Sequence, residues 1–235
     1  GNAYGANFSG GYGTLVGRLN NKDLELPPFE ILIQQAQYGI AIQNIKSTLS
    51  AEAPKEGTFR ASLGPSTGNT LDSTVQIGKI NFPPAEEGNL LVPVRAENLS
   101  LQKLVELVPD SPIDATGYLE ATLPIKIAPG GVSISSGALR SRPPGGKIQY
   151  RPKEDSASAL GDQYRLVAQA LEDYEYTRLE ADVELDPKGE MLIKARLSGT
   201  NKKLNKTRPI DVNVNIEQNL FKLLESIRMV RQFGQ

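Results

Sequence analysis

The chain has 235 residues, 39% of them hydrophobic and 23% charged, and its net charge is −1. This balance argues against a nucleic-acid-binding protein, which needs a basic face. The absence of His and Cys excludes Ser–His and Cys–His nucleophilic sites and Cys/His zinc sites, so any enzyme would have to use carboxylates, Lys, Tyr or Ser–Lys. The sequence also lacks a spaced carboxylate pair in an apolar setting, and we expect no enzyme, no cofactor and no metal. We find no signal peptide and no apolar run of about 20 residues, the length of a membrane span, and interpret the chain as a fragment of a longer protein.

The first part of the chain is predicted to form a series of strands. Residues 1–14 are rich in Gly, Asn and Tyr and are expected to be loose. Up to residue 94, apolar and polar residues then alternate in several short runs, the pattern of strands with one buried face. Pro27-Pro28 and Pro83-Pro84 mark breaks between these runs.

A short helix and a hairpin follow. Apolar residues recur at helical spacing between Ser100, a candidate N-cap, and Pro109, which ends the pattern. Residues 119–127 then alternate strictly, and Pro129-Gly130-Gly131 provides a tight turn into the return strand. This is the pattern of a β-hairpin.

The C-terminal part repeats the arrangement of a helix followed by strands. Residues 156–173 carry an apolar stripe at helical spacing, and residues 179–185 and 191–197 alternate on the two sides of a turn. Residues 210–216 alternate as a further half-buried strand, and at Glu217 the period changes to that of an amphipathic helix running to about residue 230.

These elements predict a mostly β fold of about ten strands and three helices. Short turns rich in Pro and Gly imply an antiparallel meander. The apolar faces of the strands cover more area than three short helices can bury, so the sheet either closes into a filled barrel or bends around a ligand. The residue pattern alone leaves both arrangements open.

Several stretches carry a resemblance to a known family. The most specific are Pro144-Gly145-Gly146, Ala170-Leu171-Glu172-Asp173-Tyr174, Tyr176-Thr177-Arg178-Leu179 and Ile216-Glu217-Gln218-Asn219-Leu220. They closely resemble the C-terminal domain of YdbH-like proteins, members of the AsmA-like and TamB-like group of bacterial envelope bridge proteins. The resemblance covers Leu91 to Met229. We therefore expect residues 1–90 to be groove repeats of a larger protein and residues 91–235 to be a C-terminal YdbH-like domain that continues the groove.

The resemblance implies a fold and a function. The fold is a long antiparallel meander curved into an open, taco-shaped hydrophobic groove, with about three amphipathic helices near its C-terminal end. The function is non-enzymatic: the groove carries phospholipids across the periplasm between the inner and outer membranes, and the full-length protein is anchored in the inner membrane. The alternative is a structural module that docks an outer-membrane partner and holds no lipid inside.

Lipid-facing residues are expected on the apolar side of the alternating strands, because successive side chains point to opposite faces. They are Leu119, Ala121, Leu123, Ile125, Leu179, Ala181, Val183, Leu185, Met191, Ile193, Ile210, Val212 and Val214.

Three polar groups were considered as alternative sites. Glu172, Asp173 and Glu175 form a carboxylate cluster, which we interpret as a solvated helix end rather than a glycosidase pair, because general-acid work needs a desolvated carboxyl. Tyr174 and Tyr176 are interpreted as surface residues of a strand, with a lipid–water boundary as the alternative. The basic stretch of Arg140, Arg142, Lys147 and Arg151 is either a phosphate-headgroup contact or an ordinary charged loop.

The last predicted strand offers a docking edge. It comprises Ile210, Asp211, Val212, Asn213, Val214, Asn215 and Ile216, and it has at most one sequence neighbour to pair with. Its other side is expected to present unpaired N–H and C=O groups to which another chain adds a strand. The resemblance implies a small outer-membrane lipoprotein as that partner. The alternative is that the terminal helix folds back over the edge.

Overall fold

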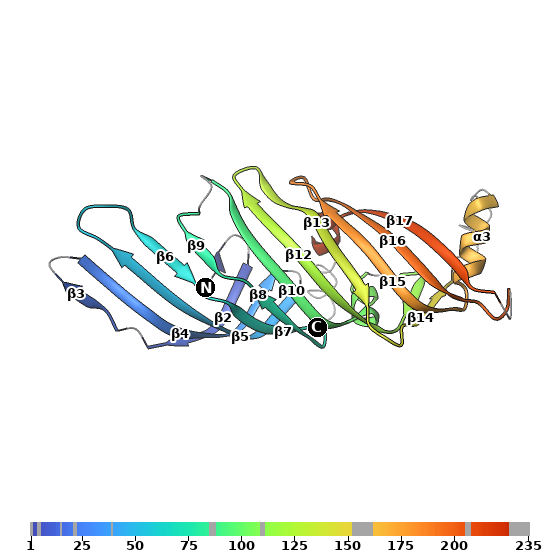
Figure 1. The fold of residues 1–235 in the computed structure, drawn as a ribbon, viewed down its shortest axis with the longest axis horizontal. Helices are drawn as coiled ribbons and strands as arrows, with labels where there is room; N and C mark the ends of the chain where they lie inside the picture. Colours follow the sequence, from blue (N-terminus) through green and yellow to red (C-terminus); the bar gives the residue numbers. More distant parts are fainter. Residues whose placement is uncertain are drawn as a thin grey trace.

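The computed structural model describes residues 2–3, 6–14, 16–20, 23–38, 40–84, 88–108, 111–151, 162–204 and 208–225. The strands in these residues pair into one antiparallel sheet. The sheet is elongated and twisted, and its strands cross the long axis obliquely (Figure 1). The predicted mostly β fold with an open antiparallel sheet is confirmed.

The elements have the following bounds. The strands are β1 (Asn2–Ala3), β2 (Ala6–Gly13), β3 (Arg18–Asn20), β4 (Asp23–Tyr38), β5 (Ile40–Ala53), β6 (Arg60–Leu63), β7 (Ser66–Thr70), β8 (Ser73–Ile77), β9 (Ile80–Phe82), β10 (Leu90–Ser100), β11 (Ile113–Ala115), β12 (Tyr118–Ala128), β13 (Gly131–Ser141), β14 (Gly146–Tyr150), β15 (Tyr174–Leu185), β16 (Glu190–Thr200) and β17 (Ile210–Asn219). The helices are α1 (Leu101–Val105) and α3 (Asp162–Leu171), and residues 220–225 are also helical. The three expected helices are therefore present, each over a shorter described range than expected.

The pairing follows the chain order closely. The main ladder runs β2–β4–β5–β7–β8–β10–β12–β13–β15–β16–β17, and β3 also pairs with β4. At one end of the C-terminal strands, β14 pairs with β15 and β11 pairs with β14. Irregular positions divide several long strands into segments, so the described sheet has 17 strands rather than the predicted ten or so.

The prediction that residues 1–14 are loose is wrong for β2, which pairs with β4 from Asn7 to Gly13. The Gly-rich sequence carries no apolar alternation, so its strand character comes from the backbone ladder that β4 provides. Gly10 has a positive φ of 64°, and a Cβ there would overlap the side chain of Gln34. A glycine at this position therefore permits a conformation that other residues rarely adopt.

The strictly alternating strands pair in one register, so their apolar residues share a face. Leu179 of β15 lies opposite Leu197 of β16, which lies opposite Val212 of β17. The opposite face carries charged residues that form ion pairs, Lys194 with Glu184 at 3.0 Å and Arg196 with Asp182 at 3.1 Å. The sheet therefore has an apolar inner face and a polar outer face over these strands.

The helices α1 and α3 pack at one edge of this inner face, whereas the helix of residues 220–225 begins at the opposite strand ends, where the Leu220 N–H donates to the Gly189 carbonyl. The Ser100 hydroxyl accepts a hydrogen bond from the Lys103 N–H at 3.3 Å, which confirms Ser100 as the N-cap of α1. α1 contacts β10 and β11, and α3 contacts β14 and β17. We call the strand ends near α1 and α3 the helix side, and the ends near the β12–β13 and β15–β16 turns the turn side.

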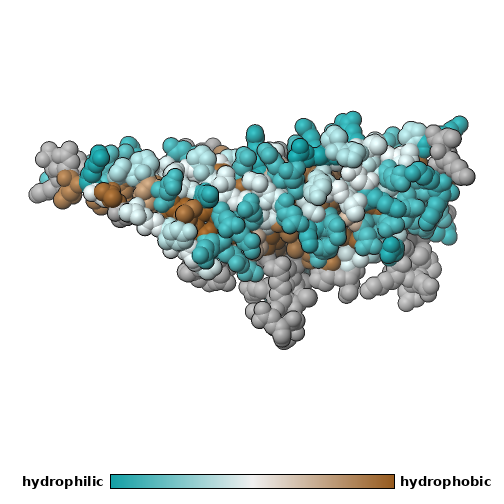
Figure 2. Space-filling model, turned by 90° about the horizontal axis from the view of Figure 1, so that it is seen from below, coloured by the Kyte–Doolittle hydropathy of each residue, from teal (hydrophilic) through white to brown (hydrophobic). Residues whose placement is uncertain are grey.

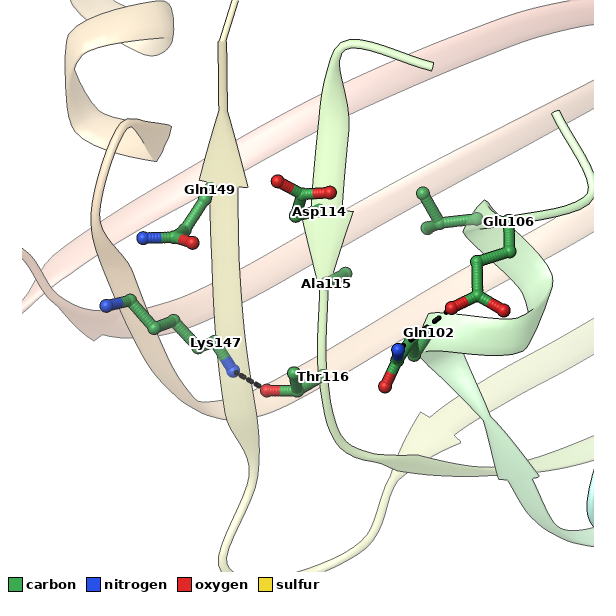
Figure 3. A pocket seen from close by; sticks show the side chains of 8 residues that line it. Gln102, Glu106, Asp114, Ala115, Thr116, Lys147 and Gln149 are labelled. Carbon is green, nitrogen blue, oxygen red and sulfur yellow. Dashed lines mark hydrogen bonds between the residues drawn. The ribbon is translucent and has the colours of Figure 1, made fainter. Parts of the chain in front are cut away.

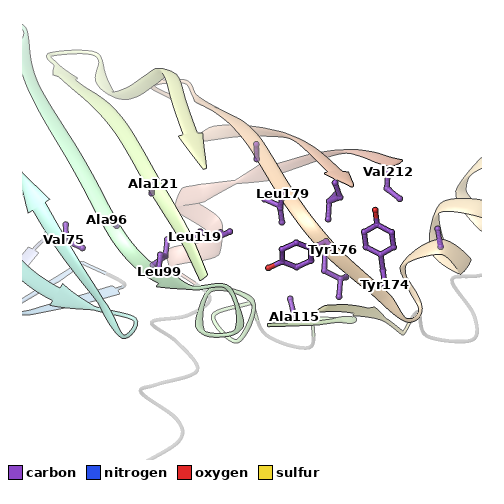
Figure 4. Packing of buried hydrophobic residues seen from close by; sticks show 14 residues of the cluster. Val75, Ala96, Leu99, Ala115, Leu119, Ala121, Tyr174, Tyr176, Leu179 and Val212 are labelled. Carbon is purple, nitrogen blue, oxygen red and sulfur yellow. The ribbon is translucent and has the colours of Figure 1, made fainter. Parts of the chain in front are cut away.

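The main hydrophobic cluster lies on the helix side (Figure 4). Its buried members run from Val75 on β8 to Val212 on β17, and α1 and α3 pack against it. Its most buried side chains include Tyr174, Tyr176 and Leu119, which are 0%, 2% and 1% exposed. This cluster is a close-packed core rather than an open lining.

Candidate functional site: the apolar inner face

The thirteen expected lipid-facing residues all lie in the sheet, and none is exposed to solvent. Seven are buried, namely Leu119, Ala121, Leu179, Ala181, Val183, Leu185 and Val212. The other six are half-buried, namely Leu123, Ile125, Met191, Ile193, Ile210 and Val214. Their role as lipid contacts stays a prediction, because a packed core and a lipid-lined groove both bury apolar side chains.

The inner face is not uniform along its strands. On β12, Leu119 is 1% exposed, whereas Ile127 on the same face at the turn side is 41% exposed. On β17, Val212 is 5% exposed and Ile216 is 42% exposed. The helix side is therefore packed, whereas the turn side of these two strands leaves apolar surface accessible.

The apolar surface is also more open toward the N-terminal strands. Figure 2 shows hydrophobic side chains at the surface over the end of the molecule where β3 to β5 lie, whereas the C-terminal end is mostly hydrophilic. Leu19 and Leu24 are among the large exposed hydrophobic side chains of this region. The exposed apolar area is thus concentrated away from α3.

Tyr174 and Tyr176 are buried, so the interpretation of these residues as surface positions is wrong. The register of β15 against β16 shifts between Tyr176 and Arg178, which reverses the phase of the alternation at this β-bulge. Alternation read backwards from Leu179 places both tyrosines outside, whereas the bulge brings them to the inner face with Leu179.

Each buried tyrosine hydroxyl is bonded to a main-chain carbonyl. Tyr174 donates to the carbonyl of Ile210 at 2.5 Å, and Tyr176 donates to the carbonyl of Thr116 at 2.8 Å. Burial raises the pKa of both tyrosines to about 12, and the charge of Asp211 adds to the shift at Tyr174. Both hydroxyls therefore stay neutral and act as donors at physiological pH.

Asn201 fixes α3 to the end of β16. Its amide donates to the carbonyls of Gln169 and Ala170 in the last turn of α3, at 3.1 and 2.9 Å. Its carbonyl oxygen accepts from the N–H groups of Lys203 and Leu204. The side chain is 1% exposed. Asn201 falls within the polar stretch after the predicted strand at 191–197, where no periodicity marked it as structural.

The expected docking strand lies at an edge of the described sheet. In the described residues, β17 pairs with β16 and with no other strand. Its pairing is uninterrupted from Gly199↔Ile210 to Glu190↔Asn219. The strand continues two residues beyond the predicted change at Glu217, and the Asn219 side chain accepts from the Lys222 N–H at 3.0 Å, as an N-cap does.

The direction of the β17 backbone groups follows from one hydrogen bond. The Leu220 N–H donates to the carbonyl of Gly189 at 2.8 Å, and this pair continues the β16–β17 register. Hydrogen-bonded and non-bonded pairs alternate in an antiparallel ladder. Val212 and Val214 therefore bond toward β16, whereas Asn213 and Asn215 direct their N–H and C=O groups away from it.

The carboxylate cluster does not form a catalytic pair. Glu172 and Glu175 are exposed, and Glu175 pairs with Lys202 at 2.9 Å. A hydrogen bond from Lys147, together with the charges of Lys147 and Lys203, holds the pKa of Asp173 below its usual value. No group of three or more His, Cys, Asp or Glu side chains suited to a metal ion occurs in the described part of the chain.

The basic stretch is engaged in ion pairs, as in a charged surface loop. Arg142 pairs with Glu120 at 3.6 Å and Arg151 pairs with Asp114 at 3.3 Å, while Lys147 is held by Asp173. Arg140 lies opposite Glu180 in the β13–β15 register.

A small open pocket of about 270 Å³ lies between α1, β11 and β14 (Figure 3). Gln102 on α1 donates to Glu106, the C-cap residue of this helix, at 2.8 Å, and the Thr116 hydroxyl accepts from the Lys147 main-chain N–H. Asp114 also lines the pocket, and its charge is paired with Arg151. The polar groups of this pocket therefore satisfy one another rather than converging on an apolar recess.

In the part of the chain that the structure describes, no helix is long and apolar enough to cross a membrane. A family model described as "YdbH-like: Intermembrane phospholipid transport protein YdbH" matches residues 2–235. No curated protein and no solved structure matches the chain significantly.

Proposed function

The chain belongs to the YdbH-like family of intermembrane phospholipid transport proteins, and on that premise we propose that phospholipids travel along its apolar inner face. Transport between membranes places the family in the cell envelope. The chain is then a segment of a periplasmic bridge whose full-length form is anchored in the inner membrane.

One observation carries this proposal. Apolar residues share one face from β10 through β12, β13, β15 and β16 to β17, as the registers Ala96↔Ala121↔Leu139↔Ala181↔Ala195↔Val214 illustrate. Acyl chains are apolar and need such a surface to leave a bilayer, because each methylene exposed to water costs about 0.8 kcal/mol. A continuous apolar face supplies that surface from β10 to β17.

A photo-crosslinker at neighbouring residues of opposite faces tests the proposal. Ile193 is half-buried on the inner face, and Lys194 is exposed on the outer face. In cells, the probe at Ile193 is expected to capture phospholipid and the probe at Lys194 is not. Equal capture of phospholipid at Ile193 and Lys194 would contradict a lipid-carrying groove on the inner face.

A second candidate function is a structural module that docks a partner and holds no lipid. The packed cluster on the helix side favours it, as does the side of β17 that pairs with no strand among the described residues. The two functions differ in lipid contact alone, so the Ile193 probe separates them.

Docking at β17 also has a place in the transport proposal. A small outer-membrane lipoprotein adds a strand to β17 and bonds to the outward N–H and C=O groups of residues such as Asn213 and Asn215. The added strand extends the apolar face, because Val212 and Val214 present their side chains to the same inner surface. Without a partner, such an edge is prone to aggregation.

A further inference from the structure

A second patch of buried apolar side chains lies on the inner face, toward the turn-side ends of the middle strands. It comprises Val92 on β10, Ile134 on β13, and Val183 and Leu185 on β15. Val92 and Ile134 both lie opposite Ile125 of β12, and Ile134 also lies opposite Leu185. None of the four buried residues belongs to the main hydrophobic cluster against which α1 and α3 pack. Their burial therefore requires a different cover.

The helix of residues 220–225 begins beside this patch. The Leu220 N–H donates to the Gly189 carbonyl at 2.8 Å, and a Cβ at Gly189 would overlap the ring of Phe221. Gly189 belongs to the turn between β15 and β16, so the helix starts at the end of the strand that carries Leu185. Figures 1 and 4 both show the helix within the span of the strands, folded back toward β13, rather than beyond their ends.

The two sides of this helix fit a position over the inner face. Leu220, Leu223 and Leu224 recur at helical spacing and are half-buried, whereas Lys222 and Glu225 are exposed. The outer face of β15 and β16 carries ion pairs, so it offers no apolar surface to a leucine stripe. The inner face does, and the leucines of the helix therefore account for the burial of the patch.

The helix leaves the inner face of the edge strand accessible. Val183 on β15 lies opposite Ile193 on β16, which lies opposite Ile216 on β17. Along this row the side chains change from 6% exposed at Val183, through half-buried at Ile193, to 42% exposed at Ile216. The cover is thus centred on β13 and β15 and thins toward β17.

We propose that the 220–225 helix is a displaceable cover whose leucines occupy the part of the apolar face that an acyl chain would contact, so that lipid must displace it to pass Ile134, Val183 and Leu185. This inference rests on the proposed transport function, and it adds a regulation of that site by the chain itself. The exchange keeps the patch out of water, because an acyl chain replaces one apolar contact by another.

The packing of the helix suits such an exchange. Its three leucines are half-buried, whereas the core residue Leu119 is 1% exposed. Elements with few buried contacts open at a lower free-energy cost than the core. The bond from Leu220 to Gly189 and the cap formed by Asn219 on the Lys222 N–H both lie at the start of the helix. They hold this start in place while the following residues move.

Loading of the chain from vesicles of phosphatidylethanolamine and phosphatidylglycerol, read by native mass spectrometry, tests the cover. Leu223→Asp/Leu224→Asp and the milder Leu223→Ala/Leu224→Ala remove the contacts of the stripe. Lys222→Asp, at an exposed position of the same helix, changes the net charge as much as the double Asp variant and is the control. We expect both leucine variants to reach half-maximal loading at a lower phospholipid concentration than wild type and control, because the competing state is removed.

Amide hydrogen exchange of the wild-type chain provides a measurement that needs no substitution. Addition of the same vesicles is expected to speed exchange in residues 220–225 and to leave exchange in β15 unchanged, because the helix lifts while the sheet stays folded. The exchange of β15 in each leucine variant also shows that its sheet is folded.

The outcomes separate the cover from transport. If the wild-type chain binds phospholipid but the leucine variants load no more readily than Lys222→Asp, or if lipid leaves the exchange of the 220–225 helix unchanged, the cover is overturned and transport stays supported. If neither wild type nor any variant binds phospholipid, the transport proposal is overturned and the cover with it.

Discussion

The Tyr174 hydroxyl donates a hydrogen bond to the main-chain carbonyl of Ile210, which joins the buried start of β15 to the first residue of β17. β16 lies between these two strands, so the bond spans it on the inner face. The edge strand is therefore held at its helix-side end by a side chain of the packed cluster as well as by its ladder with β16.

Removing either buried hydroxyl is expected to destabilise the fold while preserving its shape. Tyr174→Phe and Tyr176→Phe each remove a buried hydrogen bond to a main-chain carbonyl, so we expect each to lower the free energy of unfolding by about 0.5–1.5 kcal/mol. Urea denaturation measures this, with an unchanged slope. Tyr118→Phe, at an exposed tyrosine of β12, is the control and is expected to change stability by less than about 0.5 kcal/mol. If Tyr174→Phe and Tyr176→Phe were as stable as this control, the two hydroxyls would not form stabilising buried hydrogen bonds.

The same tyrosines predict a loss of stability at high pH. Their pKa is raised to about 12 in the folded protein, whereas an unfolded tyrosine titrates near pH 10. The stabilisation is complete below about pH 10 and is lost as the pH rises toward about 12, because the unfolded chain releases these protons first. Each tyrosine contributes a slope of about 1.4 kcal/mol per pH unit in that window.

The double variant Tyr174→Phe/Tyr176→Phe is the matched comparison for this pH dependence. The difference in unfolding free energy between wild type and variant should shrink from pH 10 to pH 12. A difference that stays constant over this window would show that neither hydroxyl is buried and neutral in the folded state.

Asn201→Ala is expected to release α3. The substitution removes the amide bonds to the carbonyls of Gln169 and Ala170, and it removes the side-chain oxygen that accepts from Lys203 and Leu204 in the following loop. We expect a loss of about 1–3 kcal/mol and faster amide hydrogen exchange in α3 than in β15, because the helix opens locally. Asn213→Ala, at an exposed asparagine of β17, is the control. Unchanged amide hydrogen exchange in α3 would contradict the role of Asn201 in holding this helix.

Proline substitutions distinguish the two sides of β17. Asn213→Pro removes an outward N–H and should leave the ladder with β16 intact, whereas Val214→Pro removes an N–H that bonds toward β16. We expect Val214→Pro to be less stable than Asn213→Pro by about 1–3 kcal/mol. Asn213→Pro should stay folded and fail to retain the small outer-membrane lipoprotein in co-purification. Undiminished binding by this folded variant would rule out β17 as the docking edge.

The strands with strict alternation were predictable because one local rule fixes them. In residues 179–185, 191–197 and 210–216 the side-chain period is two, and the structure contains β15, β16 and β17 there in the expected pairing order. The N-cap at Ser100 was predictable for the same reason, since capping depends on residues close in sequence.

Other features depend on partners distant in sequence. The bulge after Tyr176 reverses the face of two tyrosines, and alternation alone does not mark it. β2 has a Gly-rich sequence and is a strand because β4 pairs with it. Asn201 acts on α3 from about 30 residues away. The alternating apolar residues predicted an apolar face, but which of its residues are packed, such as Leu119 and Leu185, and which are accessible, such as Ile127, required the three-dimensional arrangement.

Native mass spectrometry of the purified chain after incubation with phospholipid vesicles is the most direct measurement of the central claim. The account predicts bound phospholipid on the wild-type chain, its loss in Ile216→Asp, and its retention in Asn215→Asp. Ile216 and Asn215 are adjacent and exposed on opposite faces of β17, so the charge differs only in the face that it occupies. A wild-type chain that carries no phospholipid, or equal binding by the two variants, would contradict the claim that the apolar face carries lipid.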